Sequence, residues 1–332
     1  MIRTDGLSAD TVREVLALVH TAGDADGTYP LSEHVVLHLR HGGEAPAVHL
    51  LIRSDDPLIT DGTPRPATPS GAPRPATLVG YAHVDTTDAV DGASAELAVH
   101  PMYRRRGLGR ALVLEAMAIA AEHEPRVLRL WAHGDHPAAN ALATSLGFDR
   151  WRGLWQMRRS LYAPVPEPTL PPGIRLRAFQ PGVDDEAWLA LNTAAFAEHP
   201  DQGRWTMADL RVRLSEPWFD PAGFLLAERE SDGRLVGFHW TKVHGSGAVE
   251  GGAGDQHAHG PIGEVYVLGV APAAAGTGLG TALTMAGLHH LRNLGLDQAM
   301  LYVDEANIRA VALYERLGFA QWSTDVCFRR KA

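Results

Sequence analysis

The sequence contains very little cysteine. Cys327 is the single cysteine among 332 residues, which excludes an internal disulfide. This usage is typical of a reducing compartment, and we expect a cytoplasmic protein. No base is evident beside Cys327, so we interpret it as a structural residue of a late strand, with a nucleophile as the alternative.

Long hydrophobic runs and an excess of positive charge are also absent. Apolar stretches such as ALVLEAMAIAA contain Glu115 and are far shorter than the roughly 20 residues of a membrane span. The N-terminal MIRTDGLSAD has no apolar segment of the kind found in signal peptides. The formal net charge of −9 argues against a nucleic-acid partner. We therefore expect a protein that binds neither membranes nor nucleic acid.

The length and a proline-rich stretch predict two domains. A chain of 332 residues fits two domains of about 150 residues each. Residues 161–173, LYAPVPEPTLPPG, hold five prolines in thirteen positions, which predicts an extended linker. We predict an N-terminal domain over 1–160 and a C-terminal domain over 174–332. Residues 57–77, rich in proline, and 244–260, rich in glycine and histidine, are interpreted as insertions.

The two halves repeat one another. The residue numbers differ by 171 in each of three matched pairs, which are Val99 and Val270, Gly107 and Gly278, and Leu146 and Leu317. One constant register over some fifty residues indicates an internal duplication. Each half reads as a helix, several strands, a glycine loop, a helix, a strand, a helix and a last strand. This order predicts an α/β (α+β) fold in each half.

The glycine loop favours an anion site. A strand ends at Val270 and a helix begins near Gly278, with a loop of glycine and alanine between them. Free N–H groups at the start of a helix attract an anion such as pyrophosphate. In the first half, the arginines of MYRRRGLG would add ion pairs. A tight turn without a ligand is the alternative for such a loop taken alone.

These loops and a later motif resemble those of the GNAT acetyltransferases. In that family a strand is followed by Gln/Arg-x-x-Gly-x-Gly/Ala, and a later motif reads Asn…Leu-Tyr-x-x-Leu-Gly-Phe. Here the sequences are RRRGLG, AGTGLG and NIRAVALYERLGF. Ala275 stands where the family usually has Gln or Arg. The resemblance implies two tandem domains, each a mixed, mostly antiparallel sheet flanked by helices. It also implies acetyl-CoA as co-substrate and no metal.

The resemblance assigns acetyl-CoA contacts in both halves. In the second half they are Leu268, Gly269, Val270, Ala275, Gly276, Thr277, Gly278, Leu279, Gly280, Thr281, Asn307, Ile308, Arg309, Ala310, Val311 and Ala312. In the first half they are Leu97, Ala98, Val99, Arg105, Arg106, Gly107, Leu108, Gly109 and Arg110.

Two residues of the second half have the chemistry for acetyl transfer to an amine. This reaction needs a base for the amine and a weak acid for the leaving thiolate. Glu264 opens the central strand and Tyr314 lies in the late helix, whereas the offset of 171 gives Ala93 and Ala143 in the first half. Taken one at a time, Glu264 would be interpreted as a solvated carboxylate and Tyr314 as a packing residue of its helix. Their joint absence from the first half favours a catalytic C-terminal half and a degenerate N-terminal copy that still has the acetyl-CoA loop.

Further stretches indicate the acceptor. AAFAEHPDQGRWT, GFHWTKVH and GEVYVLGVAP resemble a tandem-repeat branch of the family that acetylates an amine on a pseudodisaccharide. The resemblance places substrate contacts at Glu33, Asp201, Lys242, Glu264 and Tyr302, and we expect a monomer with a small-molecule substrate.

Three alternatives remain at this point. The acceptor could be an aminoglycoside or a protein N-terminus. The protein could be an acetyl-CoA sensor without activity, which the Glu264 and Tyr314 asymmetry argues against. Histidine pairs suggest a metalloprotein, but no matched carboxylate or cysteine accompanies them. The pairs are His34 and His38, His133 and His136, and His257 and His259.

Overall fold

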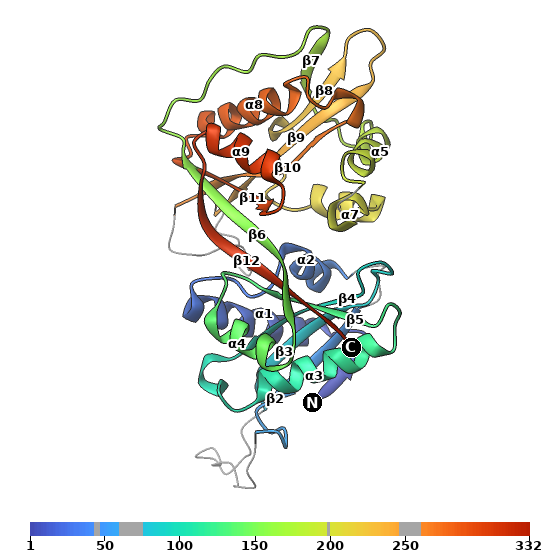
Figure 1. Ribbon diagram of the computed structural model, residues 1–332, viewed down its shortest axis with the longest axis vertical. Helices are drawn as coiled ribbons and strands as arrows, with labels where there is room; N and C mark the ends of the chain where they lie inside the picture. The colour runs from blue at the N-terminus through green and yellow to red at the C-terminus, as the bar shows by residue number, and fades with distance from the viewer. Residues whose placement is uncertain (43–46, 60–75, 198–199, 246–259) are drawn as a thin grey trace. The chain divides into compact units, whose positions relative to one another are not determined.

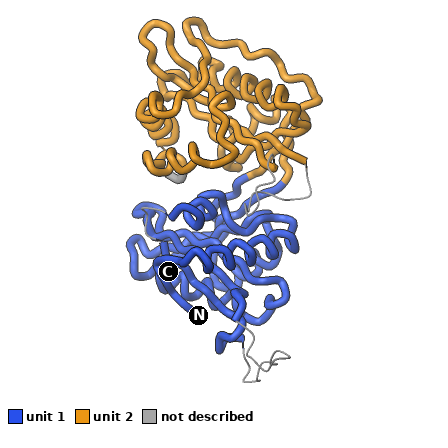
Figure 2. The backbone as a smooth tube through the Cα atoms, turned by 180° about the vertical axis from the view of Figure 1, so that it is seen from behind, with its two compact units in different colours: residues 1–154, 323–332 blue, residues 155–322 orange. Residues whose placement is uncertain are grey.

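The computed structural model divides into two compact units (Figure 2). Unit 1 comprises Met1–Leu154 and Ser323–Ala332, and unit 2 comprises Trp155–Trp322. The structure describes residues 1–42, 47–59, 76–197, 200–245 and 260–332. Most of the two predicted insertions, including His257 and His259, lies outside these residues.

Unit 1 is a mixed, mostly antiparallel sheet between two layers of helices. Strands β1 to β4 pair antiparallel in sequence order, β5 runs parallel to β4, and β12 runs antiparallel to β5. Helices α3 and α4 cover one face, and α1 and α2 cover the other. The elements are β1 (Ile2–Thr4), α1 (Ala9–Asp26), α2 (Glu33–His41), β2 (Ala47–Arg53), β3 (Leu78–Asp85), β4 (Ala93–Val99), η1 (Pro101–Tyr103), α3 (Leu108–Ala121), β5 (Val127–Ala132), α4 (Pro137–Ser145), β6 (Asp149–Ser160) and β12 (Ala320–Lys331).

Unit 2 repeats this plan with the strand order β6-β11-β10-β9-β8-β7. Strands β10 and β11 are parallel, while β10, β9, β8 and β7 pair antiparallel. Helices α8 and α9 cover one face, and α5 and α7 cover the other (Figure 1). The elements are β7 (Ile174–Ala178), α5 (Asp185–Ala195), α6 (Pro200–Gly203), α7 (Met207–Leu214), η2 (Pro221–Gly223), β8 (Phe224–Arg229), β9 (Leu235–His244), β10 (Ile262–Val270), η3 (Pro272–Ala274), α8 (Leu279–Asn293), β11 (Gln298–Asp304) and α9 (Ile308–Arg316).

The last strand of the chain begins in unit 2 and, from Ser323 onward, belongs to unit 1. Residues 326–331 of β12 pair with residues 132–127 of β5, and Cys327 lies fully buried opposite Trp131. This confirms Cys327 as a residue of a late strand. In exchange, β6 begins in unit 1 and ends in unit 2. The division therefore differs from the predicted boundaries. The sheet of unit 2 includes β6, which follows α4 of unit 1, and the sheet of unit 1 includes β12, which follows α9 of unit 2.

The predicted linker packs against unit 2. Residues 161–173 contain no helix or strand, yet Leu161 and Val165 are buried in the core formed with α8 and α9. The Leu161 N–H donates to the carbonyl of Asp297 at 2.8 Å. The segment is therefore held by apolar burial as well as by the stiffness of proline.

Aromatic side chains fill the space between α5 and the sheet of unit 2. Phe224 and Trp240 stack with ring centroids 4.3 Å apart, and Trp188 meets both edge to face. All three are fully buried. Each such side chain contributes about 1.5–3 kcal/mol by burial, so this cluster fixes α5 on the sheet.

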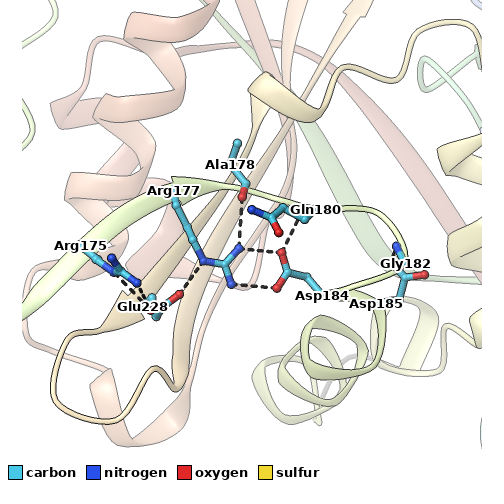
Figure 3. Close-up of polar contacts among 8 residues, drawn as sticks. All are labelled: Arg175, Arg177, Ala178, Gln180, Gly182, Asp184, Asp185 and Glu228. Carbon is cyan, nitrogen blue, oxygen red and sulfur yellow. Dashed lines mark hydrogen bonds and ion pairs between the residues drawn. The ribbon is translucent and has the colours of Figure 1, made fainter.

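An ion-pair network holds the edge strand β7 of unit 2 (Figure 3). Arg177 makes two hydrogen bonds to the carboxylate of Asp184, at 2.6 and 2.8 Å, and a third to Glu228 at 2.5 Å. Arg175 donates to the other oxygen of Glu228 at 2.6 Å. The Asp184 carboxylate also accepts from the Gln180 N–H at 2.8 Å, so one network ties β7, β8 and the start of α5 together.

None of the helices in the described part of the chain is both long and apolar enough to cross a membrane.

Candidate active site of unit 2 and its counterpart in unit 1

The glycine loop of unit 2 exposes the start of α8. Gly276 and Gly278 adopt left-handed conformations with φ of 78° and 87°, which glycine adopts without a steric penalty. Gly278 is the N-cap of α8, and no side chain caps that helix. The N-cap residue therefore satisfies none of the N–H groups of the first turn with a side chain, and the predicted anion site depends on these groups.

The loop of unit 1 has the same backbone shape. Arg105 and Gly107 have φ of 62° and 83°, and they stand 171 positions before Gly276 and Gly278. Gly107 is the N-cap of α3, again without a side-chain cap. The duplication therefore preserved the backbone conformation although one glycine became arginine.

Not all arginines of the unit 1 loop point outward. Arg104 makes two hydrogen bonds to Asp26 at the end of α1, at 2.6 and 2.8 Å, and one to the Val99 carbonyl at 3.0 Å. Its charge is therefore matched within the protein, contrary to the sequence-based expectation that it adds to an anion site. Arg105 and Arg106 are exposed.

The central parallel strands separate before they end. In unit 2, β10 pairs with β11 over residues 263–265 but with β9 as far as Val270. In unit 1, β4 pairs with β5 over residues 93–95 but with β3 as far as Val99. After residue 265 of β10 and residue 95 of β4, the described residues thus show no pairing with the parallel neighbour strand. Such an edge accepts an extended ligand by strand addition.

Glu264 and Lys242 meet on one face of the unit 2 sheet. They are directly opposite in the β9–β10 pairing and are 6% and 9% exposed. The Lys242 ammonium lies 4.8 Å from the ring centroid of Trp218 and 5.4 Å from that of Tyr266. The structure thus brings two of the predicted substrate residues together in a buried, aromatic-lined setting.

A histidine that the sequence reasoning missed completes this group. His244 Nε2 lies 2.6 Å from Glu264 Oε2. The alternation in WTKVH could have revealed it, because Lys242 and His244 are two residues apart and face the same side of β9.

Tyr302 lies on the same face as Glu264. In the parallel pairing Glu264 is opposite Met300, two residues before Tyr302 on β11. The Tyr302 hydroxyl accepts a hydrogen bond from Gln156 of β6 at 2.7 Å, and its side chain is 40% exposed. It therefore presents a polar group to solvent near the predicted base.

Tyr314 reaches the sheet from the opposite side. It is buried among the residues of α8, α9 and Val265, with its ring centroid 5.8 Å from that of Phe319. Burial raises the pKa of Tyr314 to about 12, so the phenol stays protonated at neutral pH. The two predicted catalytic side chains therefore lie on opposite faces of the sheet. Tyr314 belongs to α9, and Glu264 belongs to β10, the strand that separates from β11.

The first turn of α9 is exposed. Asn307 is its N-cap, and the Asn307 side chain accepts from the Ala310 N–H at 3.2 Å. Ile308 is 75% exposed, although it is a large apolar residue. Of the predicted acetyl-CoA contacts on α9, Ile308 is thus open to solvent, the Asn307 oxygen caps the helix, and Val311 is buried in the core.

A β-bulge distinguishes the two central strands. Val265 pairs with Thr241 and Val267 with Trp240, so Tyr266 is an extra residue on β10. The pairing of β3 with β4 in unit 1 runs without such an irregularity. A bulge at this place shifts every residue before it by one position relative to the other unit.

This shift corrects the predicted counterpart of Glu264. In unit 1, Ser94 lies opposite Asp85 at the step where Glu264 lies opposite Lys242. The ungapped offset had given Ala93, because it took no account of the bulge. Neither residue is a carboxylate, so the absence of a base at this place in unit 1 stands.

Two predicted substrate residues are placed only in part. Glu33 is the first residue of α2 in unit 1, where the Ser32 N-cap accepts from the Val35 N–H at 3.5 Å. Asp201 belongs to α6, but its side chain lies outside the described residues.

The histidines show no metal site. Among the residues that the structure describes, no group of three or more His, Cys, Asp or Glu side chains could hold a metal ion. His133 instead lies 2.9 Å from Asp325 and 3.5 Å from Glu96. Burial alone would lower the pKa of His133, but the hydrogen bond with Asp325 and the charge of the nearby Glu96 outweigh it and raise the pKa to about 10. It is therefore a buried imidazolium.

Comparison with known proteins agrees with these features. The family model described as "Acetyltransferase (GNAT) family" matches residues 47–148 and 186–319, one segment in each half. The chain belongs to the acetyltransferase (GNAT) family, as the two glycine loops and the late Leu-Tyr-x-x-Leu-Gly-Phe motif led us to expect.

Individual relatives cover nearly the whole chain. It is 54% identical over 329 residues to a "Mycothiol acetyltransferase" of Salinispora arenicola, covering 99% of this chain and 96% of that protein. It is 55% identical over 317 residues to one of Acidothermus cellulolyticus, covering 95% and 90%.

Solved structures share the tandem fold. A tandem GNAT protein from the clavulanic acid biosynthesis pathway aligns with a TM-score of 0.67 at 20% identity, over 99% of this chain and 97% of that one. A GCN5-related N-acetyltransferase from Sphaerobacter thermophilus aligns with a TM-score of 0.63 at 24% identity, over 99% and 95%. These alignments confirm the predicted tandem α/β fold.

Proposed function

We propose that the protein transfers the acetyl group of acetyl-CoA to the cysteinyl amine of desacetylmycothiol (Cys-GlcN-Ins), the last step of mycothiol biosynthesis. The full-length identity with relatives of that name carries the choice of acceptor. The buried Glu264, on the strand that separates from β11, supports the reaction type.

Acetyl-CoA binds unit 2 along the separated strand and the start of α8. Leu268, Gly269 and Val270 offer backbone groups to the pantetheine amides, and the loop from Ala275 to Thr281 offers N–H groups to the pyrophosphate. Ala275 adds no charge, so the helix start supplies the attraction. The first turn of α9, from Asn307 to Ala312, forms the remaining wall.

Unit 1 holds a second acetyl-CoA without turning it over. Its loop has the same φ pattern as that of unit 2, and Arg105, Arg106 and Arg110 are exposed beside it. Ser94 and Ala143 stand where the base and the phenol stand in unit 2, so the counterparts of those two groups are missing from unit 1.

In the transfer, the amine nitrogen attacks the thioester carbonyl, the N–C bond forms and the C–S bond breaks. An α-amine has a pKa of about 8, so a useful fraction is neutral at pH 7. Glu264 accepts the proton that the amine nitrogen loses. Tyr314, with a pKa of about 12, donates a hydrogen bond to the departing thiolate, a weaker base with a thiol pKa of about 8.5.

The acceptor is held by polar side chains around Glu264. Lys242 and Tyr302 lie on the same face as Glu264 and suit the hydroxyl groups of a pseudodisaccharide. We propose a cytoplasmic monomer that acts on this small molecule alone.

Mass spectrometry tests the proposal. Purified protein is incubated with acetyl-CoA and Cys-GlcN-Ins, with an aminoglycoside and a peptide N-terminus as competing amines. Acetylated Cys-GlcN-Ins with stoichiometric release of CoA supports it. Acetylation of only a competing amine would replace the acceptor, and acetyl-CoA binding without acetylation of any amine would indicate a sensor.

A further inference from the structure

His244 forms a hydrogen bond to the predicted base, Glu264. Its Nε2 lies 2.6 Å from Glu264 Oε2, and the two side chains are 13% and 8% exposed. His244 is opposite Ile262 and Glu264 is opposite Lys242, so the contact runs diagonally between two paired strands. Both partners are thus held by a rigid sheet.

This contact satisfies a buried carboxylate. A buried carboxylate needs hydrogen-bond donors, because it has lost its water. Among the described residues, the side chain that forms a hydrogen bond with the Glu264 carboxylate is that of His244. Lys242 lies opposite Glu264, but its ammonium is directed over the rings of Trp218 and Tyr266.

We propose that His244 is a positioning residue for the transfer and that it acts through Glu264. The Nε2–H of the imidazole donates to Oε2 and favours the ionised carboxylate in one rotamer. Oε1 is thereby left to accept the proton that the amine nitrogen loses when it attacks the thioester. This inference rests on the function proposed above, with Glu264 as the base.

Other titratable and charged groups lie on the same face. They are Lys242 on the strand of His244, Tyr266 on β10, Tyr302 on β11 and Arg213 on α7, whose Nε donates to the Tyr266 hydroxyl at 2.8 Å. The test therefore has to separate the effect of His244 from that of the surrounding charge.

Three variants make that separation. H244A removes the donor, H244Q keeps an N–H donor without a titratable ring, and H123A removes an exposed histidine of unit 1 as a control. We expect H244A to lower kcat roughly tenfold to a hundredfold, below the 10²–10⁴-fold typical of losing an acid or base. The KM for acetyl-CoA should stay unchanged, and H244Q should recover most of the rate.

The pH profile distinguishes positioning from a structural role. A hydrogen bond donated to the ionised form favours that form, so its loss in H244A should move the acidic limb of kcat/KM to higher pH. H244Q should keep the wild-type limb, and adding H244A to E264Q should cost little beyond E264Q alone. An unchanged kcat and profile in folded H244A, or fully additive losses in the double variant, would overturn the proposal.

A second measurement does not depend on turnover. In an imidazole ¹⁵N NMR titration of the free protein, E264Q should move the midpoint of His244 to lower pH than in wild type, because it removes a carboxylate that favours the imidazolium. An identical midpoint would refute the pairing whatever amine the enzyme acetylates. Failure of Cys-GlcN-Ins as acceptor, with the NMR shift present, would instead refute only the proposed function.

Discussion

Ser94 of unit 1 occupies the position in its strand pair that Glu264 occupies in unit 2. The residues opposite them are Asp85 and Lys242, so the charge of the neighbouring strand is also reversed. The two strand pairs thus differ in the bulge at Tyr266 and in the carboxylate and its cationic neighbour, which are present in unit 2 but not at the equivalent positions of unit 1. This places all of the proposed proton transfer in unit 2.

Replacement of the proposed base should abolish transfer by the whole chain. We expect E264Q to lower kcat by about 10²–10⁴-fold, because unit 1 has no carboxylate at the equivalent place to substitute for it. Acetyl-CoA affinity, measured by calorimetry, should remain at the wild-type value, since the loop and α8 are untouched. S94A provides the matched control in unit 1, and wild-type turnover in E264Q would contradict the assignment.

The phenol of Tyr314 should affect rate without affecting stability. The Tyr314 ring packs in an apolar cluster, and Y314F keeps that ring, so it should change the melting temperature little. We expect kcat to fall about tenfold or more while acetyl-CoA binding persists. Because burial raises the pKa of Tyr314 to about 12, no alkaline limb in the pH profile below about pH 11 should come from this group.

The exposed Tyr162 serves as the control for Y314F. Y162F makes the same chemical change at a phenol that is 76% exposed, and it should leave kcat unchanged. Equal kcat values for Y314F and Y162F would remove Tyr314 from the mechanism.

The ion-pair network at β7 should contribute measurably to the stability of unit 2. R177A leaves the buried Asp184 without its bidentate partner and should lower the free energy of unfolding by about 2–3 kcal/mol. R175A, at a side chain that is 59% exposed, should cost about 1 kcal/mol or less. Urea unfolding followed by tryptophan fluorescence measures both.

The same pair predicts a pH dependence. The hydrogen bonds from Arg177 hold the pKa of Asp184 below its ordinary value of about 3.9. Its contribution is therefore present above that pH and is lost as the pH falls through the lower folded-state value. The difference between wild type and R177A should shrink in acid, and a constant difference down to pH 2 would contradict this.

His133 should make unit 1 sensitive to alkali. Its pKa is raised to about 10 in the folded state, because the carboxylates of Asp325 and Glu96 outweigh the effect of burial, against about 6.5 when unfolded. The stabilisation is complete below about pH 6.5 and is lost as the pH rises through about 10. H133Q should abolish this loss relative to wild type in urea unfolding between pH 6 and 10, with the exposed H123Q as control. Parallel curves for wild type and H133Q would show that the imidazolium is not formed.

Local patterns were enough for much of the site. Glycines at the two loops, the late Leu-Tyr-x-x-Leu-Gly-Phe and the alternation around Lys242 are short-range features, and backbone sterics near them determine the loop and strand that form. Glu264 could be named from its chemistry, and Lys242 from the family resemblance, before their opposite positions in the strand pairing were known. Arg104 could not, because its partner Asp26 lies 78 residues away along the chain.

The sequence by itself determined the duplication, the two glycine loops and the membership of the acetyltransferase family, because each depends on residues close together in the chain. The tertiary structure alone decided three other features: the exchange of β6 and β12, the bulge at Tyr266 that makes Ser94 the counterpart of Glu264, and the contact of His244 with that base. Each of these depends on which distant strands pair and in what register, and pairing is set by the packing of whole sheets rather than by any local run of residues.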